Sequence, residues 1–257
     1  MRNYNHLKFH VSNEIARITL NRPTKHNALH PELMSELSEL CETISKLTDI
    51  RVVLLDAAGA NFCAGADLEW MSGQINNTFN DNKEDAIRLG TFFHTLSTIP
   101  QPLIGVVQGK VFGGGLGLLA CCDVVIAAED AQFCFSEVKL GLIPATITPY
   151  IIRKIGYSHA RALFISADRF DAAHALRIGL IHRLATANTV SETADRYATK
   201  LKANAPLAMA QTKQLVDQFF PVEPQMIDFT AEMLAHVRVG DEAQGRMNAF
   251  FTGDNTC

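Results

Sequence analysis

One glutamate stands where a side chain could transfer protons. Glu137 ends Phe133-Cys-Phe-Ser-Glu137, which resembles the end of an apolar strand, and the apolar stretch Leu140-Gly-Leu-Ile-Pro144 follows it. Apolar surroundings disfavour a charged carboxylate and raise its pKa, which suits a general acid or base near neutral pH. The same pattern is also compatible with a glutamate that caps a helix or is solvated.

Two glycine-containing loops each follow a predicted buried strand. The first loop is residues 61–68, after a strand that ends at Asp56, and the second is residues 109–117, after a strand that ends at Gln108. Each leads into a predicted helix, whose first N–H groups have no partner within the helix, and glycine allows a ligand close to the backbone. Two such helix starts aimed at one point would bind an oxygen that gains negative charge. Tight turns that serve only packing are the alternative.

Other chemical motifs are weak or absent. Gly115-Leu-Gly-Leu-Leu-Ala120 matches G-x-G-x-x-A, but the preceding strand ends too early for a dinucleotide-binding turn. The sequence contains neither a P-loop nor a G-x-S-x-G elbow. His26 and His30 form the only close histidine pair and have no third ligand nearby, so no metal site is predicted. The six cysteines form no C-x-x-C pair, which favours reduced, mostly buried thiols.

The elements that must position these residues alternate between strands and helices in the first 145 residues. We predict a hairpin of residues 6–11 and 14–20, helices over 31–47 and 84–97, a polar mobile loop over 76–83, strands over 51–56, 102–108, 123–128 and 131–135, and a glycine-led helix within 113–122. From Pro149 onward the sequence is predicted to be almost wholly helical. This order favours an α/β core followed by a helical region.

Composition and charge narrow the class of protein. The chain has 257 residues, of which 47% are apolar and 19% charged, so intrinsic disorder is excluded. A net charge of −4 gives no electrostatic reason to expect nucleic-acid binding. The longest apolar run, residues 111–122, is too short to span a membrane, and the N-terminus lacks the apolar core of a secretory signal. We therefore expect a cytoplasmic protein.

A series of short motifs resembles the crotonase (enoyl-CoA hydratase/isomerase) superfamily over roughly residues 5 to 250. The matching segments are Asn21-Arg-Pro23, Asn27-Ala-Leu29, Phe62-Cys-Ala-Gly-Ala-Asp67, Gly113-Gly-Gly115, Cys122-Asp123, Ala131-Gln-Phe133 and Glu137-Val-Lys-Leu-Gly-Leu-Ile-Pro144. The resemblance implies an α/β spiral of ββα units (ClpP-like) over residues 1–200 and a helical trimerisation region over 201–257. It also implies a homotrimer or a dimer of trimers that binds acyl-CoA thioesters and needs no separate cofactor.

The same resemblance assigns roles to individual residues. The backbone N–H groups of Ala64 and Gly114 would form the oxyanion hole, and Glu137 would be the catalytic acid/base. The implied coenzyme A and acyl contacts are Lys25, Asn27, Ala28, Ala66, Asp67, Leu68, Trp70, Met71, Leu142 and Ile147, with Phe250 and Phe251 as C-terminal candidates.

The sequence departs from the family pattern at one catalytic position. Hydratases of this family typically use two glutamates, and the position of the first is Gly117 here. The surrounding segment is similar to bacterial methylglutaconyl-CoA hydratases of leucine breakdown, which predicts a hydratase with one glutamate and room at Gly117 for a branched acyl chain. A Δ3,Δ2-enoyl-CoA isomerase and a catalytically weak acyl-CoA binder are the alternatives. Lys139 and Arg153 are candidate partners for a distal carboxylate of the substrate.

Overall fold

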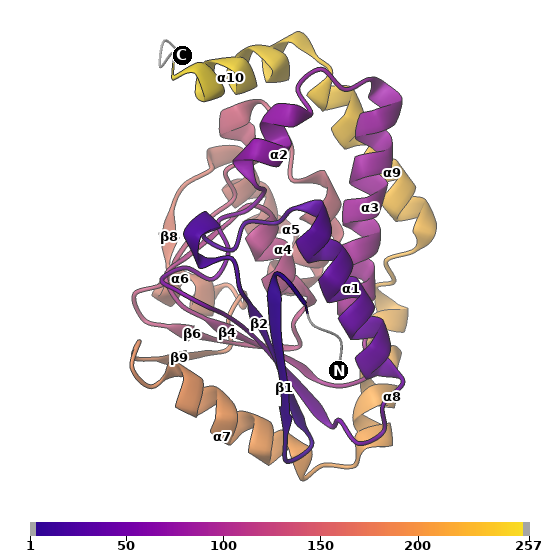
Figure 1. Ribbon diagram of the computed structural model, residues 1–257, viewed down its shortest axis with the longest axis vertical. Helices are drawn as coiled ribbons and strands as arrows, with labels where there is room; N and C mark the ends of the chain where they lie inside the picture. Colours follow the sequence, from indigo (N-terminus) through magenta and orange to yellow (C-terminus); the bar gives the residue numbers. More distant parts are fainter. Residues whose placement is uncertain (1–3, 254–257) are drawn as a thin grey trace.

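A six-stranded sheet with the order β1-β2-β3-β4-β6-β9 is the centre of the computed structural model, which describes residues 4–253 (Figure 1). β1 pairs with β2 antiparallel, and the remaining neighbours are parallel. The strands are β1 (Leu7–Ser12), β2 (Ile15–Leu20), β3 (Val52–Ala57), β4 (Leu103–Val107), β6 (Val124–Ala128) and β9 (Arg183–Ala185). Its central strands are almost continuously apolar, as expected for strands with both faces covered.

Helices cover both faces of this sheet. The α-helices are α1 (Pro31–Ser45), α2 (Leu68–Gly73), α3 (Phe79–Ser97), α4 (Gly114–Cys121), α5 (Thr148–Ser166), α6 (Ala172–Arg177), α7 (Val190–Lys202), α8 (Pro206–Phe219), α9 (Pro224–Arg238) and α10 (Asp241–Thr252). Successive strand residues point to opposite faces, so Val52 and Leu54 pack against α7 while Val53 and Leu55 enter the large core that includes α1. Figure 1 shows α7 on the far side of the sheet from α1.

A second, three-stranded sheet forms where the chain turns between the main sheet and the next helix. It consists of β5 (Lys110–Phe112), β7 (Gln132–Cys134) and β8 (Phe170–Asp171). A bridge between Cys63 and Val111 places the first glycine loop beside it. The order of main strand, short strand and helix, as in β4-β5-α4, is the expected α/β spiral of ββα units, which this architecture confirms.

One local prediction was wrong and another was incomplete. The stretch predicted as a polar loop over 76–83 contains the start of α3 at Phe79, because Thr78 and Asp81 form a reciprocal capping box that fixes the helix start. The region after Pro149 is almost wholly helical, as predicted, but it also contains the short strands β8 and β9, and β9 pairs with β6 and extends the main sheet. β9 has only three residues, too few for a period-two pattern to reveal it.

Two of the C-terminal helices, α9 and α10, pack onto the core, whereas α8 has no buried residue. α9 lies along α3, and α10 closes the end of the molecule next to α2 (Figure 1). The division into residues 1–200 and 201–257 stays a prediction. Cys41, Cys63, Cys121, Cys122 and Cys134 are free and buried as expected, while Cys257 lies outside the described residues. Within residues 4–253, no helix is long and apolar enough to cross a bilayer.

Candidate active site

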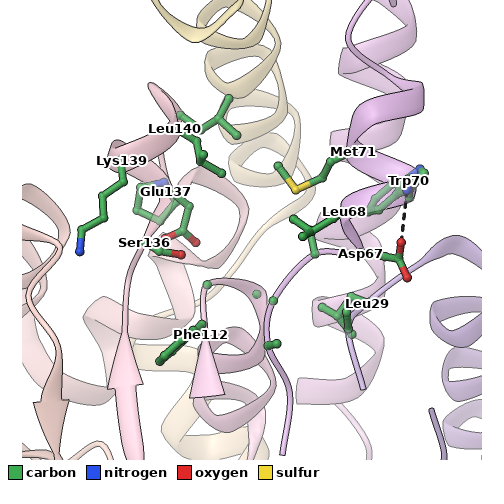
Figure 2. Close-up of a pocket in the computed structure, with 18 of the residues that line it drawn as sticks. Leu29, Asp67, Leu68, Trp70, Met71, Phe112, Ser136, Glu137, Lys139 and Leu140 are labelled. Atoms are coloured by element: carbon green, nitrogen blue, oxygen red, sulfur yellow. Dashed lines mark hydrogen bonds between the residues drawn. The ribbon is translucent and has the colours of Figure 1, made fainter. Parts of the chain in front are cut away.

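A cavity of about 820 Å³ opens between the two glycine loops, α2, the turn after β7, and helices α9 and α10 (Figure 2). It brings together most of the residues singled out in the sequence. The predicted residues that line it are Lys25, Ala28, Ala64, Ala66, Asp67, Leu68, Trp70, Met71, Gly114, Glu137, Lys139, Leu142, Ile147 and Phe250. Asn27, Gly117, Arg153 and Phe251 are not among its lining residues.

The two glycine loops touch each other at the floor of the cavity. A Cβ atom on Gly65 would lie 3.1 Å from the carbonyl oxygen of Phe112, and one on Gly113 would lie 3.9 Å from the Cα of Gly65. Both glycines also have positive φ angles, +98° and +47°, which larger residues rarely adopt. Glycine therefore allows the two loops that lead into α2 and α4 to meet at one place.

Hydrogen bonding identifies which backbone N–H groups of these loops are available. The N–H of Ala64 donates to the carbonyl oxygen of His26 at 3.0 Å, so Ala64 cannot supply the predicted oxyanion-hole donor in this structure. Leu29 pairs with the residues on either side of Ala66, receiving from Asp67 and donating to Gly65. This pairing turns the N–H of Ala66 away from Leu29. Within residues 4–253, neither this N–H nor that of Gly114 has a hydrogen-bond acceptor.

Glu137 stands next to these donors. It begins a short 3₁₀ turn directly after β7, where the N–H of Leu142 donates to its backbone oxygen at 3.0 Å. Its carboxylate oxygen Oε1 lies 3.3 Å from the position of a Cβ on Gly113, and its Oε2 is buried without a hydrogen-bond partner among the described residues. Burial raises the pKa of Glu137 to about 7, so the carboxyl can both accept and release a proton near neutral pH.

The position of the missing second glutamate is filled by apolar side chains. Gly117 is buried inside α4, and a Cβ there would lie 2.5 Å from Ile147 Cγ2 and 2.7 Å from the Phe93 ring. The prediction that Gly117 leaves room for a branch of the substrate was therefore wrong, because Phe93 and Ile147 already occupy that space. Ile147 presents an apolar wall to the cavity in place of a second carboxylate.

Asp67 and Asn27 are occupied by the protein itself. The Asp67 carboxylate caps α2 by accepting from the N–H groups of Glu69 and Trp70, and it pairs with Arg22 at 2.9 Å. Burial opposes ionisation, but the hydrogen bonds from Arg22 and Trp70 outweigh it and lower the pKa of Asp67. The fully buried Asn27 side chain donates to two backbone oxygens of the loop before Phe62. Figure 2 shows Asp67 turned toward Trp70 rather than toward Glu137.

The cations near the cavity differ from those predicted. Lys139 lines it from an exposed position, whereas Arg153 forms an ion pair with Asp217 away from it. Arg238, in the last turn of α9, also lines the cavity and was missed. Only the packing of α9 against α3 brings it there, and no local motif marks it. Phe251 packs beside the cluster of Met71 and Leu142 instead of lining the cavity.

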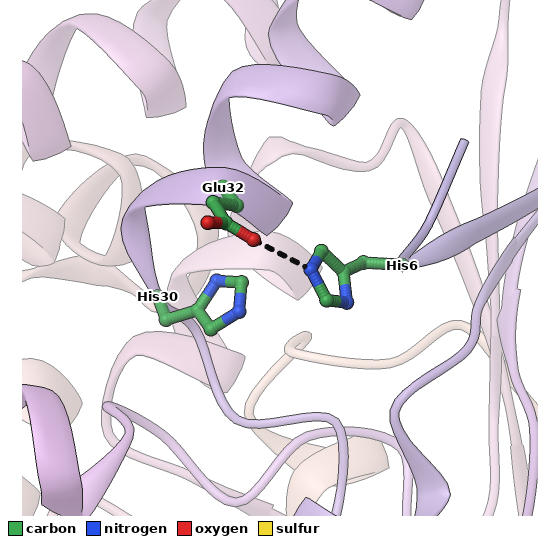
Figure 3. Close-up of side chains that lie close together, drawn as sticks. All are labelled: His6, His30 and Glu32. Atoms are coloured by element: carbon green, nitrogen blue, oxygen red, sulfur yellow. Dashed lines mark hydrogen bonds and ion pairs between the residues drawn. The ribbon is translucent and has the colours of Figure 1, made fainter. Parts of the chain in front are cut away.

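A possible metal-binding cluster lies away from the cavity, among His6, His30 and Glu32 (Figure 3). Their candidate ligand atoms lie within 4.8 Å of one another, and His6 Nε2 is 3.0 Å from Glu32. His30 Nδ1 accepts the N–H of Leu33 and caps α1, so the neutral ring carries its proton on Nε2 and lacks a free lone pair there. His26, which lies close to His30 in the sequence, contacts Asn61 and does not belong to this cluster.

Comparison with known proteins adds sequence evidence to this geometry. Residues 10–252 match the family model described as "Enoyl-CoA hydratase/isomerase". The chain is 30% identical over 240 residues to a short-chain-enoyl-CoA hydratase of Clostridium acetobutylicum, covering 92% of this chain and 91% of that protein. It is 33% identical over 203 residues to the 2,3-dehydroadipyl-CoA hydratase of Escherichia coli, covering 78% and 77%.

Solved structures show the same arrangement of elements. A crystal structure described as a putative enoyl CoA hydratase/isomerase (crotonase) from Legionella pneumophila superposes with a TM-score of 0.80 at 41% identity. The superposition covers 96% of each chain. The α/β architecture of the whole chain therefore has a structural counterpart in this protein.

Proposed function

Because the chain belongs to the enoyl-CoA hydratase/isomerase family, we propose that it adds water to an α,β-unsaturated acyl-CoA thioester, with Glu137 as its single acid/base. The observation that carries this proposal is the Glu137 carboxylate beside the start of α4, whose Oε2 is buried without a hydrogen-bond partner among the described residues. In the same place, Ala66 and Gly114 offer backbone N–H groups without acceptors among residues 4–253. An acid/base next to two free donors is the arrangement that an enolate intermediate requires.

The proposed reaction moves charge onto the thioester oxygen. The N–H groups of Ala66 and Gly114 donate to this oxygen, which becomes negative as the enolate forms. Glu137 takes a proton from water while the water oxygen bonds to C3 and the C2–C3 double bond opens. The protonated Glu137 then delivers the proton to C2. A pKa of about 7 suits both halves of this exchange.

Isomerisation of a 3-enoyl-CoA is the second candidate function, and one observation favours it. Ile147 and Phe93 fill the position of the second glutamate, so no second side-chain carboxylate is available there to hold water. A 1,3-proton shift through the same enolate needs only one base. A protein that binds acyl-CoA with little turnover is a third possibility.

The finer assignments are also proposals. We propose a branched substrate similar to 3-methylglutaconyl-CoA, as in leucine catabolism, with coenzyme A held near Lys25, Ala28, Leu68 and Phe250. Coenzyme A belongs to the substrate, and the proposed mechanism uses no other cofactor. We further propose a cytoplasmic homotrimer or dimer of trimers, because the exposed Leu207, Phe219 and Phe229 give α8 and α9 an uncovered apolar surface.

Loss of ultraviolet absorbance of the conjugated thioester tests the proposal directly. Purified protein is given 3-methylglutaconyl-CoA or crotonyl-CoA, and the Glu137→Gln variant is compared with Glu129→Gln, an exposed control. The hydratase predicts decay that only the Glu137 variant abolishes. Isomerase activity would instead raise absorbance from a 3-enoyl-CoA without consuming water. Binding of coenzyme A without turnover of any substrate would favour the third candidate, a protein that binds acyl-CoA with little turnover.

A further inference from the structure

Arg238 is a partly buried cation in the wall of the cavity. It ends α9 and lines the same space as Glu137. Its Nη1 donates to Gln74 Oε1 at 3.2 Å and to Asn82 Oδ1 at 3.3 Å. Both partners are buried, and both are neutral amides. These bonds hold the guanidinium in place without neutralising its charge.

No carboxylate of residues 4–253 forms an ion pair with Arg238. The nearest acid that influences it is Asp85, whose two oxygens accept from Gln74 and Arg88. Burial lowers the pKa of Arg238, and the charge of Asp85 only partly offsets this effect. A guanidinium has five N–H donors, and Nε and Nη2 have no acceptor among the described residues. Neither atom is among the buried side-chain atoms that lack a partner, so both are open to the cavity. Partial burial of a cation without an anionic partner is unfavourable, so this arrangement suits an anion that arrives with the ligand.

The surroundings of Arg238 distinguish it from the other cations of the cavity. Lys25, Lys139 and Arg246 are exposed, as expected for groups that meet a solvated phosphate. Arg238 lines the cavity together with apolar side chains, among them Leu234 of the same helix and Met71 of α2. An oriented guanidinium in an apolar wall matches a planar carboxylate, which it can bind through two parallel hydrogen bonds.

We propose that Arg238 binds a carboxylate at the distal end of the acyl chain, which makes enoyl-CoA thioesters with a second, free carboxylate the preferred substrate class. This inference rests on the proposed function and adds to it a specificity-determining residue. Arg238 takes over the role predicted for Lys139 or Arg153. Its N–H groups position the acyl chain and take no part in the proton transfers at C2 and C3.

Two saturated thioesters that cannot react provide the sharpest test. Glutaryl-CoA and pentanoyl-CoA have acyl chains of the same length, and only the first ends in a carboxylate. Calorimetric dissociation constants are measured for wild type, Arg238→Met, Arg238→Lys and the exposed control Arg161→Met. We expect wild type and the control to prefer glutaryl-CoA by about ten- to a hundredfold, the effect of a charge-assisted hydrogen bond. The preference should vanish in Arg238→Met and return in part in Arg238→Lys.

The other outcomes separate the possible errors. Equal affinity of wild type for the two ligands overturns the inference. An equal loss of affinity for both ligands in Arg238→Met also overturns it, because the guanidinium would then bind coenzyme A or stabilise the fold. Hydration of 3-methylglutaconyl-CoA, which has a distal carboxylate, and of crotonyl-CoA, which has none, is followed in the same preparations. If wild type prefers glutaryl-CoA but turns over no enoyl-CoA, the proposed function fails while the role of Arg238 stands.

Discussion

Two carboxylates in the walls of one cavity have opposite environments. Asp67 accepts two backbone N–H groups at the start of α2 and pairs with Arg22, and its pKa is lowered. Glu137 has one oxygen buried without a partner, and its pKa is raised to about 7. Burial disfavours the charge on both residues, and only Asp67 has partners that outweigh this effect.

This difference separates a residue that builds the site from one that could react in it. Asp67 fixes the first turn of α2 and with it the adjacent N–H of Ala66. Its lone pairs are already used, so it has little capacity to exchange protons with a ligand. Glu137 retains its proton-transfer capacity because the fold leaves it unsatisfied, which is a common source of instability at active sites.

The largest expected effect is on turnover. Replacing Glu137 by Gln removes the acid/base, and we expect kcat for crotonyl-CoA to fall about 10²–10⁴-fold. Asp67→Asn should lower kcat less than about tenfold, because the amide keeps the shape and can still cap the helix. Steady-state kinetics of both variants measure the two losses of kcat. Similar losses of kcat in the two variants would contradict the different roles of Asp67 and Glu137.

The second effect is on the free energy of unfolding, which should fall in the Asp67 variant and not in the Glu137 variant. Asp67→Asn leaves Arg22 without its buried partner, so we expect a loss of about 3 kcal/mol in the free energy of unfolding. Because the folded pKa of Asp67 is lowered, its stabilisation is complete above the unfolded pKa of about 3.9 and is lost as the pH falls through the folded pKa. Urea denaturation near pH 7 measures the full effect. Unchanged stability would show that the ion pair contributes nothing.

Glu137→Gln should stabilise the protein while it inactivates it. The raised pKa of Glu137 means that the folded state loses stability as the pH rises from about 4.5 through about 7. The amide has no charge to lose, so the gain should reach at most about 3 kcal/mol near pH 8 and shrink near pH 5. Urea titrations at both pH values measure this trend. A variant that is less stable than wild type at high pH would contradict the unfavourable burial of Glu137.

The same comparison explains how much of the site could be predicted from the sequence. Glu137 and the two glycine loops each lie within a short sequence motif. The resemblance carried by these motifs therefore predicted the spiral of ββα units, and the loop sequences predicted that the two glycine loops meet. The choice between the N–H groups of Ala64 and Ala66 depends on His26 and Leu29, which approach from another segment. Gly117 was misread for a similar reason, because Phe93 and Ile147 reach it only through packing of α3 and the turn before α5. The place of Arg238 in the cavity wall could not be predicted, because only the packing of α9 against α3 brings it there.

The smallest expected effect concerns a third carboxylate of the cavity, that of Glu69. It pairs with Lys25 at the mouth, where the side chains are 78% and 45% exposed. Water and salt screen such a pair, so Glu69→Gln should change the free energy of unfolding by less than about 1 kcal/mol. Urea denaturation at low and high salt should give nearly the same difference from wild type. If Glu69→Gln lowered the free energy of unfolding as much as Asp67→Asn, an exposed ion pair would stabilise the protein as well as a buried one. Burial of the pair would then not matter for the stabilisation.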